Sequence, residues 1–445
     1  MLIIPTSIGC FGDSTLSSAS YTIENALLLD GSSDYLTLVP ATSSRDNWTF
    51  GTWLKRSKLG TKQQIWDSQR LTAAYGNDGI WFNSSDKLEW EIQAVGGSVI
   101  GELITTQVFR DTSAWMHVLW SYSSTAAVAD RMRLWVNFVE VTAFDTDTRP
   151  SSGADSITGN DNPKFGWGAQ TGGAENFNGY FAQSFHLDGT STTDPLTIGE
   201  ISGTTGQAVP KDITGLDFSG TNSFLLDYAV APETGNGAGT DIGGNGKHFT
   251  EVSLVAALQV EDSPTDNHAT LNPLAEGNNS SNLVTYTDGN TIATQPGSHG
   301  CMVYGSIGVS SGKWVWEVNP IVANAGYVAV FGIGIASVTS KEMSNAADTP
   351  WNSTYANGYA YKADGQKNVL GTDSSYGAAY NASNLIRVEL NLDDDEVEFF
   401  RDDASQGSFA ITTGLTWFPA WYQYVASDSV QFKFKDLTNT PTSGF

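Results

Sequence analysis

The chain has 445 residues, which predicts two or three domains, each large enough to bury its own core. With 48 Asp and Glu against 22 Lys and Arg, its net charge is −26, and its cations form no basic stripe. Since nucleic acids and anionic membrane surfaces are bound through clustered cations, this composition argues against both as direct partners.

The first segment, MLIIPTSIGCFGDST, is apolar at its start. It has no preceding basic residue and no apolar run long enough for a signal peptide, and no stretch of the chain is apolar enough for a membrane span. We therefore expect a protein made in the cytoplasm, with no signal peptide and no membrane insertion. Residues 1–20 are interpreted as an anchoring segment that binds a neighbouring protein, with a disordered tail as the other interpretation. Cys10 and Cys301 are too distant in sequence to suggest a disulfide framework or a Cys-type metal site.

Residues 21–195 carry closely spaced strand patterns. In RMRLWVNF, for example, the apolar residues Met132, Leu134, Val136 and Phe138 alternate with polar ones. Turn residues recur at intervals of about ten residues, the spacing of a β-sandwich. Period-two alternation with polar partners indicates antiparallel sheets with one buried face. This stretch is therefore predicted to be a jelly-roll-like β-sandwich.

Residues 196–272 are rich in Gly and Thr and have few strong strand patterns. The apolar groups in FLLDY, DIGGNGKHF and LVAALQVE suffice for packing, so we expect an ordered bridge rather than a flexible linker. Residues 253–262 and residues 340–347 are the two places where a short helix is expected.

Residues 273–445 return to strand patterns. In LIRVELNLD the apolar side chains of Ile386 and Val388 share one face, while Arg387 and Glu389 share the other. LNLDDDEVEFF predicts two strands joined by an acidic turn at 393–395. A second β-sandwich follows from this pattern, and the whole chain is expected to be all-β.

A search for catalytic chemistry gives one candidate pair. In LEWEIQ, Glu89 and Glu91 lie on the same face of a strand, about 7 Å apart. Glycoside hydrolysis uses two carboxylates at about 5 to 9.5 Å. Exposed strand carboxylates are the simpler interpretation. The five His show no metal-ligand spacing, and no nucleophile or phosphate-binding motif is present, so we expect no enzyme.

Loop aromatics with neighbouring amides are candidates for glycan contacts, because sugar faces stack on rings. Each candidate could instead be a core or interface residue. The candidates are Trp167 and Gln170 in GWGAQTGG, Trp351, Asn352 and Tyr355 in PWNSTYANG, and Tyr376 and Tyr380 in SSYGAAYNASN.

No cofactor or catalytic metal is expected. The acidic turns at 30–34 and 393–395 could offer oxygens to a structural calcium ion, although such turns are mostly turns alone.

Two family resemblances rest on ordered sets of motifs. The first half of the chain resembles laminin-G-like, concanavalin-type jelly rolls. The motifs that carry this resemblance are LLLDGSSDYLTL, WTFGTWLKRS, AWMHVLWSYSS, RMRLWVNF and GAQTGGAENFNGYFAQSFHLDG. The last part of the chain resembles SPRY domains, which are another concanavalin-like sandwich. The motifs that carry this resemblance are SSGKWVWEV, FGIGIA, GYAYKADGQKNVLG, IRVELNLDDDEVEFFRDD and FPAWYQYVASDSVQFKF. Glucanases of the concanavalin type usually have a further acidic residue, which the sequence does not reveal beside Glu89 and Glu91.

The order of these two domains resembles virion proteins of tailed bacteriophages, especially marine ones. The resemblance implies a non-catalytic tail fibre or external appendage, made in the host cytoplasm, that binds a host-surface glycan or protein receptor or other virion proteins. It also implies a homo-oligomer, a trimer for a fibre or a larger ring for the tail tube. A carbohydrate-active enzyme with a binding module and a bacterial extracellular adhesin remain the other interpretations.

Overall fold

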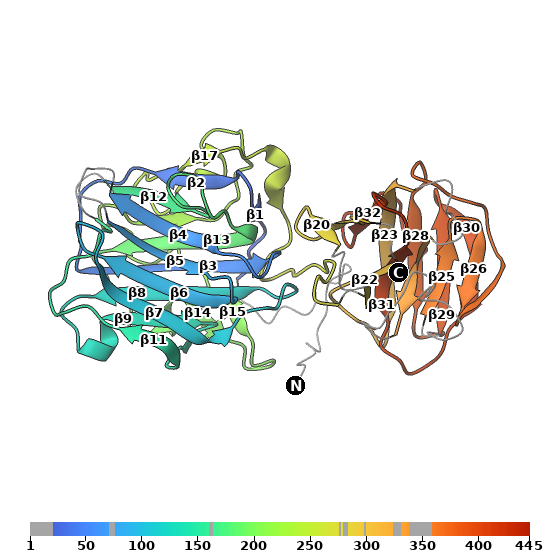
Figure 1. Cartoon of the computed structure of the whole chain (residues 1–445), viewed down its shortest axis with the longest axis horizontal. Helices are drawn as coiled ribbons and strands as arrows, with labels where there is room; N and C mark the ends of the chain where they lie inside the picture. The colour runs from blue at the N-terminus through green and yellow to red at the C-terminus, as the bar shows by residue number, and fades with distance from the viewer. Residues whose placement is uncertain are drawn as a thin grey trace. The chain divides into compact units, whose positions relative to one another are not determined.

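The structure is a computed structural model that describes residues 21–70, 76–159, 163–275, 277–278, 284–297, 300–323, 331–337 and 358–445. It divides into two compact units, residues 21–267 and residues 268–445 (Figure 1). The helices in the described ranges are four short 3₁₀ turns, so the predicted all-β fold class is confirmed. None of these helices is long and apolar enough to cross a membrane. The 3₁₀ turns are η1 (Val128–Asp130), η2 (Pro195–Thr197), η3 (Gly237–Gly239) and η4 (Ala256–Leu258).

The first unit is a sandwich in which the described residues form two eight-stranded antiparallel sheets. Sheet A has the order β10-β9-β8-β3-β13-β1-β18, with β16 paired to β13; sheet B has the order β11-β7-β6-β5-β4-β12-β2-β17. The strands of sheet A are β10 (Val139–Glu140), β9 (Met132–Val136), β8 (Met116–Ser123), β3 (Asn47–Arg56), β13 (Asn178–Asp188), β1 (Ala26–Asp30), β18 (Gln259–Val260) and β16 (Phe224–Leu226). Those of sheet B are β11 (Phe144–Thr148), β7 (Val99–Val108), β6 (Lys87–Gln93), β5 (Asn77–Phe82), β4 (Gln63–Arg70), β12 (Pro163–Trp167), β2 (Tyr35–Leu38) and β17 (Thr250–Val252).

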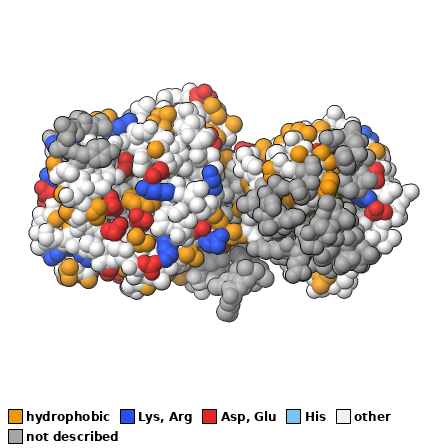
Figure 2. Space-filling view, in the orientation of Figure 1, with side chains coloured by type: hydrophobic (Ala, Val, Ile, Leu, Met, Phe, Trp, Pro, Cys, Tyr) orange, Lys and Arg blue, Asp and Glu red, His pale blue; other side chains and the backbone are white. Residues whose placement is uncertain are grey.

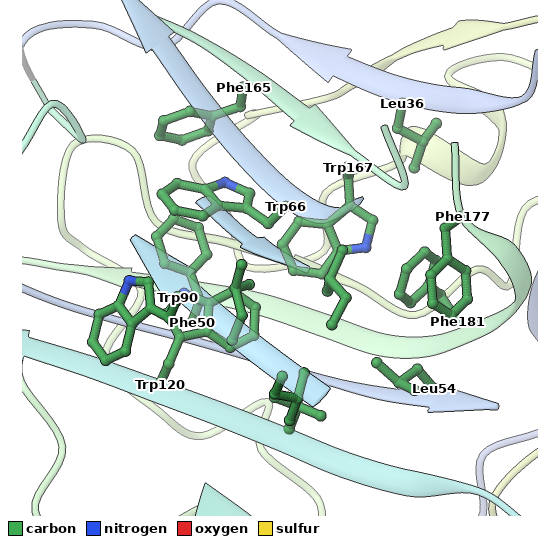
Figure 3. Close-up of a cluster of buried hydrophobic side chains, with 14 of the residues drawn as sticks. Leu36, Phe50, Leu54, Trp66, Trp90, Trp120, Phe165, Trp167, Phe177 and Phe181 are labelled. Carbon is green, nitrogen blue, oxygen red and sulfur yellow. The ribbon is translucent and has the colours of Figure 1, made fainter. Parts of the chain in front are cut away.

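Aromatic rings from both sheets fill the space between them. Phe50 of β3 packs against Trp66 of β4 at a centroid distance of 4.3 Å and against Trp120 of β8 at 5.6 Å (Figure 3). The alternation in NWTFGTW places Trp48 and Phe50 toward this core, and both are fully buried. Each such ring removes about 150–250 Å² from water, so these aromatics dominate the hydrophobic stabilisation of the unit.

The predicted bridge is part of the first unit. Its strands β16, β17 and β18 pair with β13, β2 and β1, which extends both sheets. Its residues 196–225, which include the hairpin β14 (Gly199–Ile201) and β15 (Ala208–Pro210), cover the outer face of sheet A. The apolar side chains in this cover are Ile198, Ile213, Phe218 and Leu225, which pack on Trp53, Leu119, Trp135 and Phe185. The unit therefore ends at residue 267 rather than near residue 195.

The short helix predicted over residues 253–262 is absent. The structure has only the single 3₁₀ turn η4 there, followed by β18, because pairing with β1 takes the backbone into a strand. Nearby, Lys55 Nζ contacts the Asp262 carboxylate at 2.6 Å in the interior and fixes this segment to β3. The helix predicted over residues 340–347 lies outside the described residues.

The second unit is a β-sandwich, as the sequence predicts, and its described residues form two seven-stranded antiparallel sheets. Sheet C has the order β19-β22-β31-β24-β25-β26-β27, and sheet D has the order β20-β21-β32-β23-β28-β29-β30. The core between them includes Trp316, Trp417 and Trp421, all buried. Sheet C comprises β19 (Gly277–Asn278), β22 (Cys301–Tyr304), β31 (Phe418–Gln423), β24 (Gly332–Ala336), β25 (Gly358–Lys362), β26 (Gln366–Val369) and β27 (Thr372–Ser375). Sheet D comprises β20 (Thr285–Thr287), β21 (Ile292–Thr294), β32 (Ser429–Lys433), β23 (Lys313–Val322), β28 (Ile386–Asn391), β29 (Glu396–Arg401) and β30 (Ala404–Ala410).

Candidate functional site

The outward face of sheet B carries a row of polar side chains. Along β6, Leu88, Trp90 and Ile92 point into the core, while Glu89 and Glu91 lie half-buried on the opposite face. This arrangement follows from the period-two alternation of LEWEIQ. The two carboxylates of the candidate pair thus share one accessible face of the sheet.

A third carboxylate joins them from the neighbouring strand. Glu102 of β7 is the direct cross-strand partner of Glu91. Cβ atoms of such partners lie about 4.5–5.5 Å apart. Desolvation, followed by the negative charges of Glu89 and Glu91, raises the pKa of the Glu102 carboxyl above its usual value. We call Glu89, Glu91 and Glu102 the carboxylate row.

The sequence-based search missed Glu102 because its position depends on strand pairing rather than on local spacing. The sequence AVGGS, which forms the turn between β6 and β7, could have indicated that these two strands pair. Gly96 and Gly97 of this turn have φ values of 106° and 84°, a conformation that glycine adopts at little cost. A hairpin at this turn brings the two strands together and places the carboxylates of both on one face.

Side-chain amides orient two members of the carboxylate row. Asn83 Nδ2 donates to Glu89 Oε2 at 3.0 Å, and Gln93 Nε2 donates to Glu91 Oε1 at 2.6 Å. These hydrogen bonds engage one oxygen of each carboxylate. The arrangement offers acceptor oxygens in a fixed pattern, which suits recognition of hydroxyl groups.

A loop of residues 168–176 covers the adjoining part of sheet B. Thr171 N donates to Asp67 Oδ2 at 3.0 Å, and Gln64 N donates to Glu175 O at 2.7 Å. The loop lies so close to Gly166 that a Cβ there would approach Ala169 O to 2.4 Å. The loop therefore covers β4 and β12, and β5 lies between these strands and the carboxylate row. Burial beneath the loop raises the pKa of Asp67 to about 6, although Thr171 N and Asn77 Nδ2 stabilise its ionised form.

One aromatic ring lies beside the carboxylate row, but a lysine covers it. Trp81 of β5 is the cross-strand partner of Glu89. Lys62 Nζ lies 4.0 Å from the centroid of the Trp81 ring and 2.9 Å from Glu175 Oε2. Figure 2 shows acidic side chains with a few basic ones among them over the middle of this unit, where Figure 1 draws β4, β5 and β6. A ligand on this face meets mainly oxygen acceptors.

Two of the predicted glycan-contact residues are core residues instead. Trp167 is fully buried, and its ring packs against Trp120 and Phe181 (Figure 3). Tyr380 is 2% exposed, and its hydroxyl donates to Tyr361 O at 2.8 Å. A buried ring has no free face for a sugar, so the prediction for these two residues is corrected. Both lie beside Gly- or Ser-rich sequence that resembles an exposed loop, but the chain folds their rings inward.

The remaining predicted contacts lie in different places. Gln170 belongs to the 168–176 loop, where its Nε2 donates to Glu175 Oε2 at 2.8 Å. The Tyr376 ring is partly buried against Phe409, and its hydroxyl donates to Gly407 O. Trp351, Asn352 and Tyr355 lie outside the described residues. Of the predicted set, Gln170 is joined to the neighbourhood of the carboxylate row through Glu175, which pairs with the Lys62 that lies over Trp81.

The acidic turns suggested for calcium are held by their own hydrogen bonds. Asp30 Oδ1 accepts from Ser32 N at 2.7 Å and from Ser33 N at 3.0 Å. Asp393 Oδ1 accepts from Gly312 N at 3.0 Å. Within the described ranges, no group of three or more His, Cys, Asp or Glu has an arrangement that could hold a metal ion.

A separate hollow of about 280 Å³ opens where β13 ends, beside η2. It is lined by threonine and aliphatic side chains together with Asp194 and Asp217. Asp194 accepts a hydrogen bond from Leu196 N, and Asp217 from Ser219 N, so both carboxylates already cap local turns. The carboxylate row is the stronger candidate because it combines three acceptors with orienting amides.

Comparison with known families supports the fold of the first unit. A family described as the concanavalin A-like lectin/glucanases superfamily, of laminin-G type, matches residues 30–185. Residues 30–185 are laminin-G-like. The matched range includes β4 to β7 of sheet B and therefore the whole carboxylate row. No curated protein matches the chain.

Solved structures similar to the chain include SPRY domains. The SPRY domain of human HERC1 has 15% identity and a TM-score of 0.32, and the match covers 38% of this chain and 99% of that one. A second human SPRY domain has 17% identity and a TM-score of 0.27, with 35% and 96% covered. The heptameric SAP-like pentraxin from Limulus polyphemus has 14% identity and a TM-score of 0.30, with 39% and 80% covered.

Proposed function

We propose that this protein is a non-catalytic binding protein whose laminin-G-like domain binds an uncharged, hydroxyl-rich glycan on the carboxylate row. The observation that carries the proposal is the convergence of Glu89, Glu91 and Glu102 on one accessible sheet face, with amides bonded to two of them. Carboxylate oxygens are strong acceptors for sugar hydroxyls. The net charge of −26 disfavours anionic glycans and leaves neutral ones as the fitting class.

We also propose that the chain is an external part of a tailed-bacteriophage virion, such as a tail fibre or appendage. The support is the sequence resemblance together with the order of the domains, a laminin-G-like sandwich followed by a second β-sandwich. A host-surface glycan is then the ligand, and other virion proteins are further partners. We favour a homo-oligomer, with a trimer as the preferred state. Several weak binding sites that engage the surface together then give a high overall avidity.

A second candidate function is glycoside hydrolysis, which one observation favours. Glu91 and Glu102 are cross-strand partners, and Cβ atoms of such partners lie about 4.5–5.5 Å apart. Two carboxylates on neighbouring strands in this register can approach to the distance of about 5–5.5 Å between carboxyl groups that retaining glycosidases use. The raised pKa of Glu102 is also the property that a general acid needs. Binding remains the preferred proposal because Lys62 covers Trp81, the aromatic ring that would flank a sugar at the reacting bond.

An array of neutral and anionic polysaccharides tests both candidates in one experiment. The wild-type chain and a Glu91→Gln/Glu102→Gln variant are applied, and bound protein and released reducing ends are both measured. We expect the wild type to bind neutral glycans without releasing reducing ends, and the variant to bind about tenfold more weakly. Glu396→Gln, an exposed change in the second unit, is the matched control and should bind like the wild type.

Two results would overturn the proposal. Release of reducing ends by the wild type, abolished in the variant, would establish the hydrolase. Equal binding by wild type and variant would remove the carboxylate row as the binding site.

A further inference from the structure

Charged side chains in the middle of sheet D are buried, although they lie on its outward face. Glu317 of β23 and Arg387 of β28 are direct cross-strand partners, and Glu389 lies two residues further along β28. The sequence alternation places these groups away from the core, where solvent is expected. Their exposed fractions are nevertheless 0%, 3% and 1%. The chain segment of residues 436–445 covers them.

The charged groups hold this segment through its backbone. Glu317 accepts hydrogen bonds from Thr438 N at 2.6 Å and from Asn439 N at 2.8 Å. Glu389 Oε1 accepts from Thr442 N at 2.8 Å. Arg387 Nη1 donates to Thr440 O at 3.2 Å. All these bonds go to main-chain atoms and are charge-assisted, so the face recognises a peptide backbone of a given shape.

The segment buries its own side chains only in part, since Leu437, Pro441 and Phe445 are half-buried and none of them belongs to the apolar core of the unit. Thr438 and Thr440 are exposed, whereas Phe434, just before the segment, is the last residue of the chain in the apolar core of the unit. Because the segment contributes no side chain to that core, it can leave without uncovering the core. The three charges would then be hydrated by water, which avoids an unpaired buried charge.

A backbone turn directs the segment back onto its own sheet. Asp436 has a φ of 51°, in the left-handed region, just after the end of β32. Asp tolerates this conformation at some cost in free energy. An extended conformation at Asp436 would relieve that cost and carry the segment away from its own unit. Such a hinge is the element through which chains exchange identical segments.

We propose that the outward face of β23 and β28 is a peptide-binding clamp, which also binds residues 436–445 of a second copy of this chain in place of its own. The clamp consists of Glu317, Arg387 and Glu389. Exchange of the segment links two copies without the need for an additional interface, because the exchanged segment makes the same contacts that it makes within one chain. The clamp is independent of the carboxylate row and would operate whether or not a glycan is the ligand.

The test uses a chain that ends at Lys435 and a fluorescein-labelled peptide of residues 436–445. Circular dichroism first establishes that the shortened chain is folded. Fluorescence anisotropy should then show saturable binding to the shortened chain and binding about tenfold weaker to the full chain, whose own segment competes. Glu317→Gln/Glu389→Gln in the shortened chain should weaken binding about tenfold, and Glu396→Gln should not.

Peptide chemistry separates backbone recognition from nonspecific adhesion. N-methylation at Thr438 and Asn439 removes both donors to Glu317 and should abolish binding. N-methylation at Ser443, outside the described hydrogen bonds, should leave binding intact. No binding to the folded shortened chain, or binding that survives methylation at Thr438 and Asn439, would overturn the clamp.

Two measurements on the full chain complete the test. Light scattering should show oligomers whose fraction rises with concentration for the full chain and a smaller species for the shortened one; equal masses would overturn exchange between copies. Trypsin should cleave after Lys435 about tenfold faster in Glu317→Gln/Glu389→Gln than in Glu396→Gln. Equal rates would contradict the clamp, even if the shortened chain fails to fold.

Discussion

Glu91 and Glu102 lie directly opposite each other on adjacent strands of sheet B, on the face that points away from the core. Like charges in this position destabilise a sheet. Gln93 is hydrogen-bonded to Glu91, and under the proposed function this pair gives up some stability of the sheet to form the binding surface. The first prediction follows from that cost.

Glu102→Gln should stabilise the first unit at neutral pH. The folded-state pKa of Glu102 is raised by desolvation and by its acidic neighbours, so ionisation of the wild type costs stability as the pH rises through that range. Because Glu102 is half-buried and still reached by solvent, which screens the repulsion, the gain should be only about 0.2–1 kcal/mol at pH 7. The gain should vanish at low pH, where the carboxyl is protonated in both states. Thermal denaturation at several pH values measures it, and a gain that persists in acid would contradict the charge explanation.

His117 should limit stability in acid. Burial lowers its pKa to about 3, and neither ring nitrogen has a hydrogen-bond partner among the described residues. The ring packs between Trp53 and Phe138. Since the folded-state pKa lies below the unfolded value, the stability contribution is present above the unfolded pKa, about 6.5, and is lost as the pH falls toward 3.

His117→Phe should therefore flatten the acid side of the stability profile. Relative to its own value at pH 7, the wild type should lose on the order of 3 kcal/mol at pH 4 that the variant retains. Urea denaturation at both pH values gives the comparison. Parallel losses in wild type and variant would assign the acid sensitivity to other groups.

Asp78 should have the opposite pH dependence. Full burial raises its pKa to about 7, although Thr158 and Gln93 N donate hydrogen bonds to it. The folded-state pKa of Asp78 lies above the unfolded value. The contribution of Asp78 to the free energy of unfolding is therefore fully present below about pH 4 and is lost as the pH rises to 7. Asp78→Asn should cost stability in acid, since the amide cannot accept all these bonds, and the deficit should shrink toward pH 7. A deficit that does not change between pH 4 and pH 8 would contradict this pKa.

Trp167→Phe should lower stability and leave glycan binding unchanged. Trp167 fills the core between the two sheets, so the smaller ring leaves a cavity, with an expected cost of about 1–3 kcal/mol. Thermal denaturation and binding to the glycan array are measured on the same preparation. Loss of glycan binding in a folded Trp167→Phe variant would show that Trp167 is a glycan contact after all.

The features of the fold that depend on local alternation could be predicted from the sequence. The period-two patterns in RMRLWVNF and LIRVELNLD gave the sandwich class, and LEWEIQ placed Glu89 and Glu91 on one face. Glu102 joins them only through pairing with a strand across a hairpin, and local spacing does not specify such pairing.

Burial by distant segments could not be predicted in the same way. Glu389 lies on the outward face as expected, but residues 436–445 cover it, far from β28 in the sequence. Trp167 and Tyr380 stand beside loop-like residues, yet their rings complete the cores. The Gly- and Thr-rich residues after 195 resemble a linker in composition, although their scattered apolar groups cover sheet A.

The most direct test of the central claim is a crystal structure of the chain with an oligosaccharide identified on the glycan array. The account predicts sugar hydroxyls within hydrogen-bonding distance of the Glu91 and Glu102 carboxylates, over β6 and β7. A sugar bound elsewhere, in the hollow beside η2 or on the second unit, with the carboxylate row empty, would contradict it.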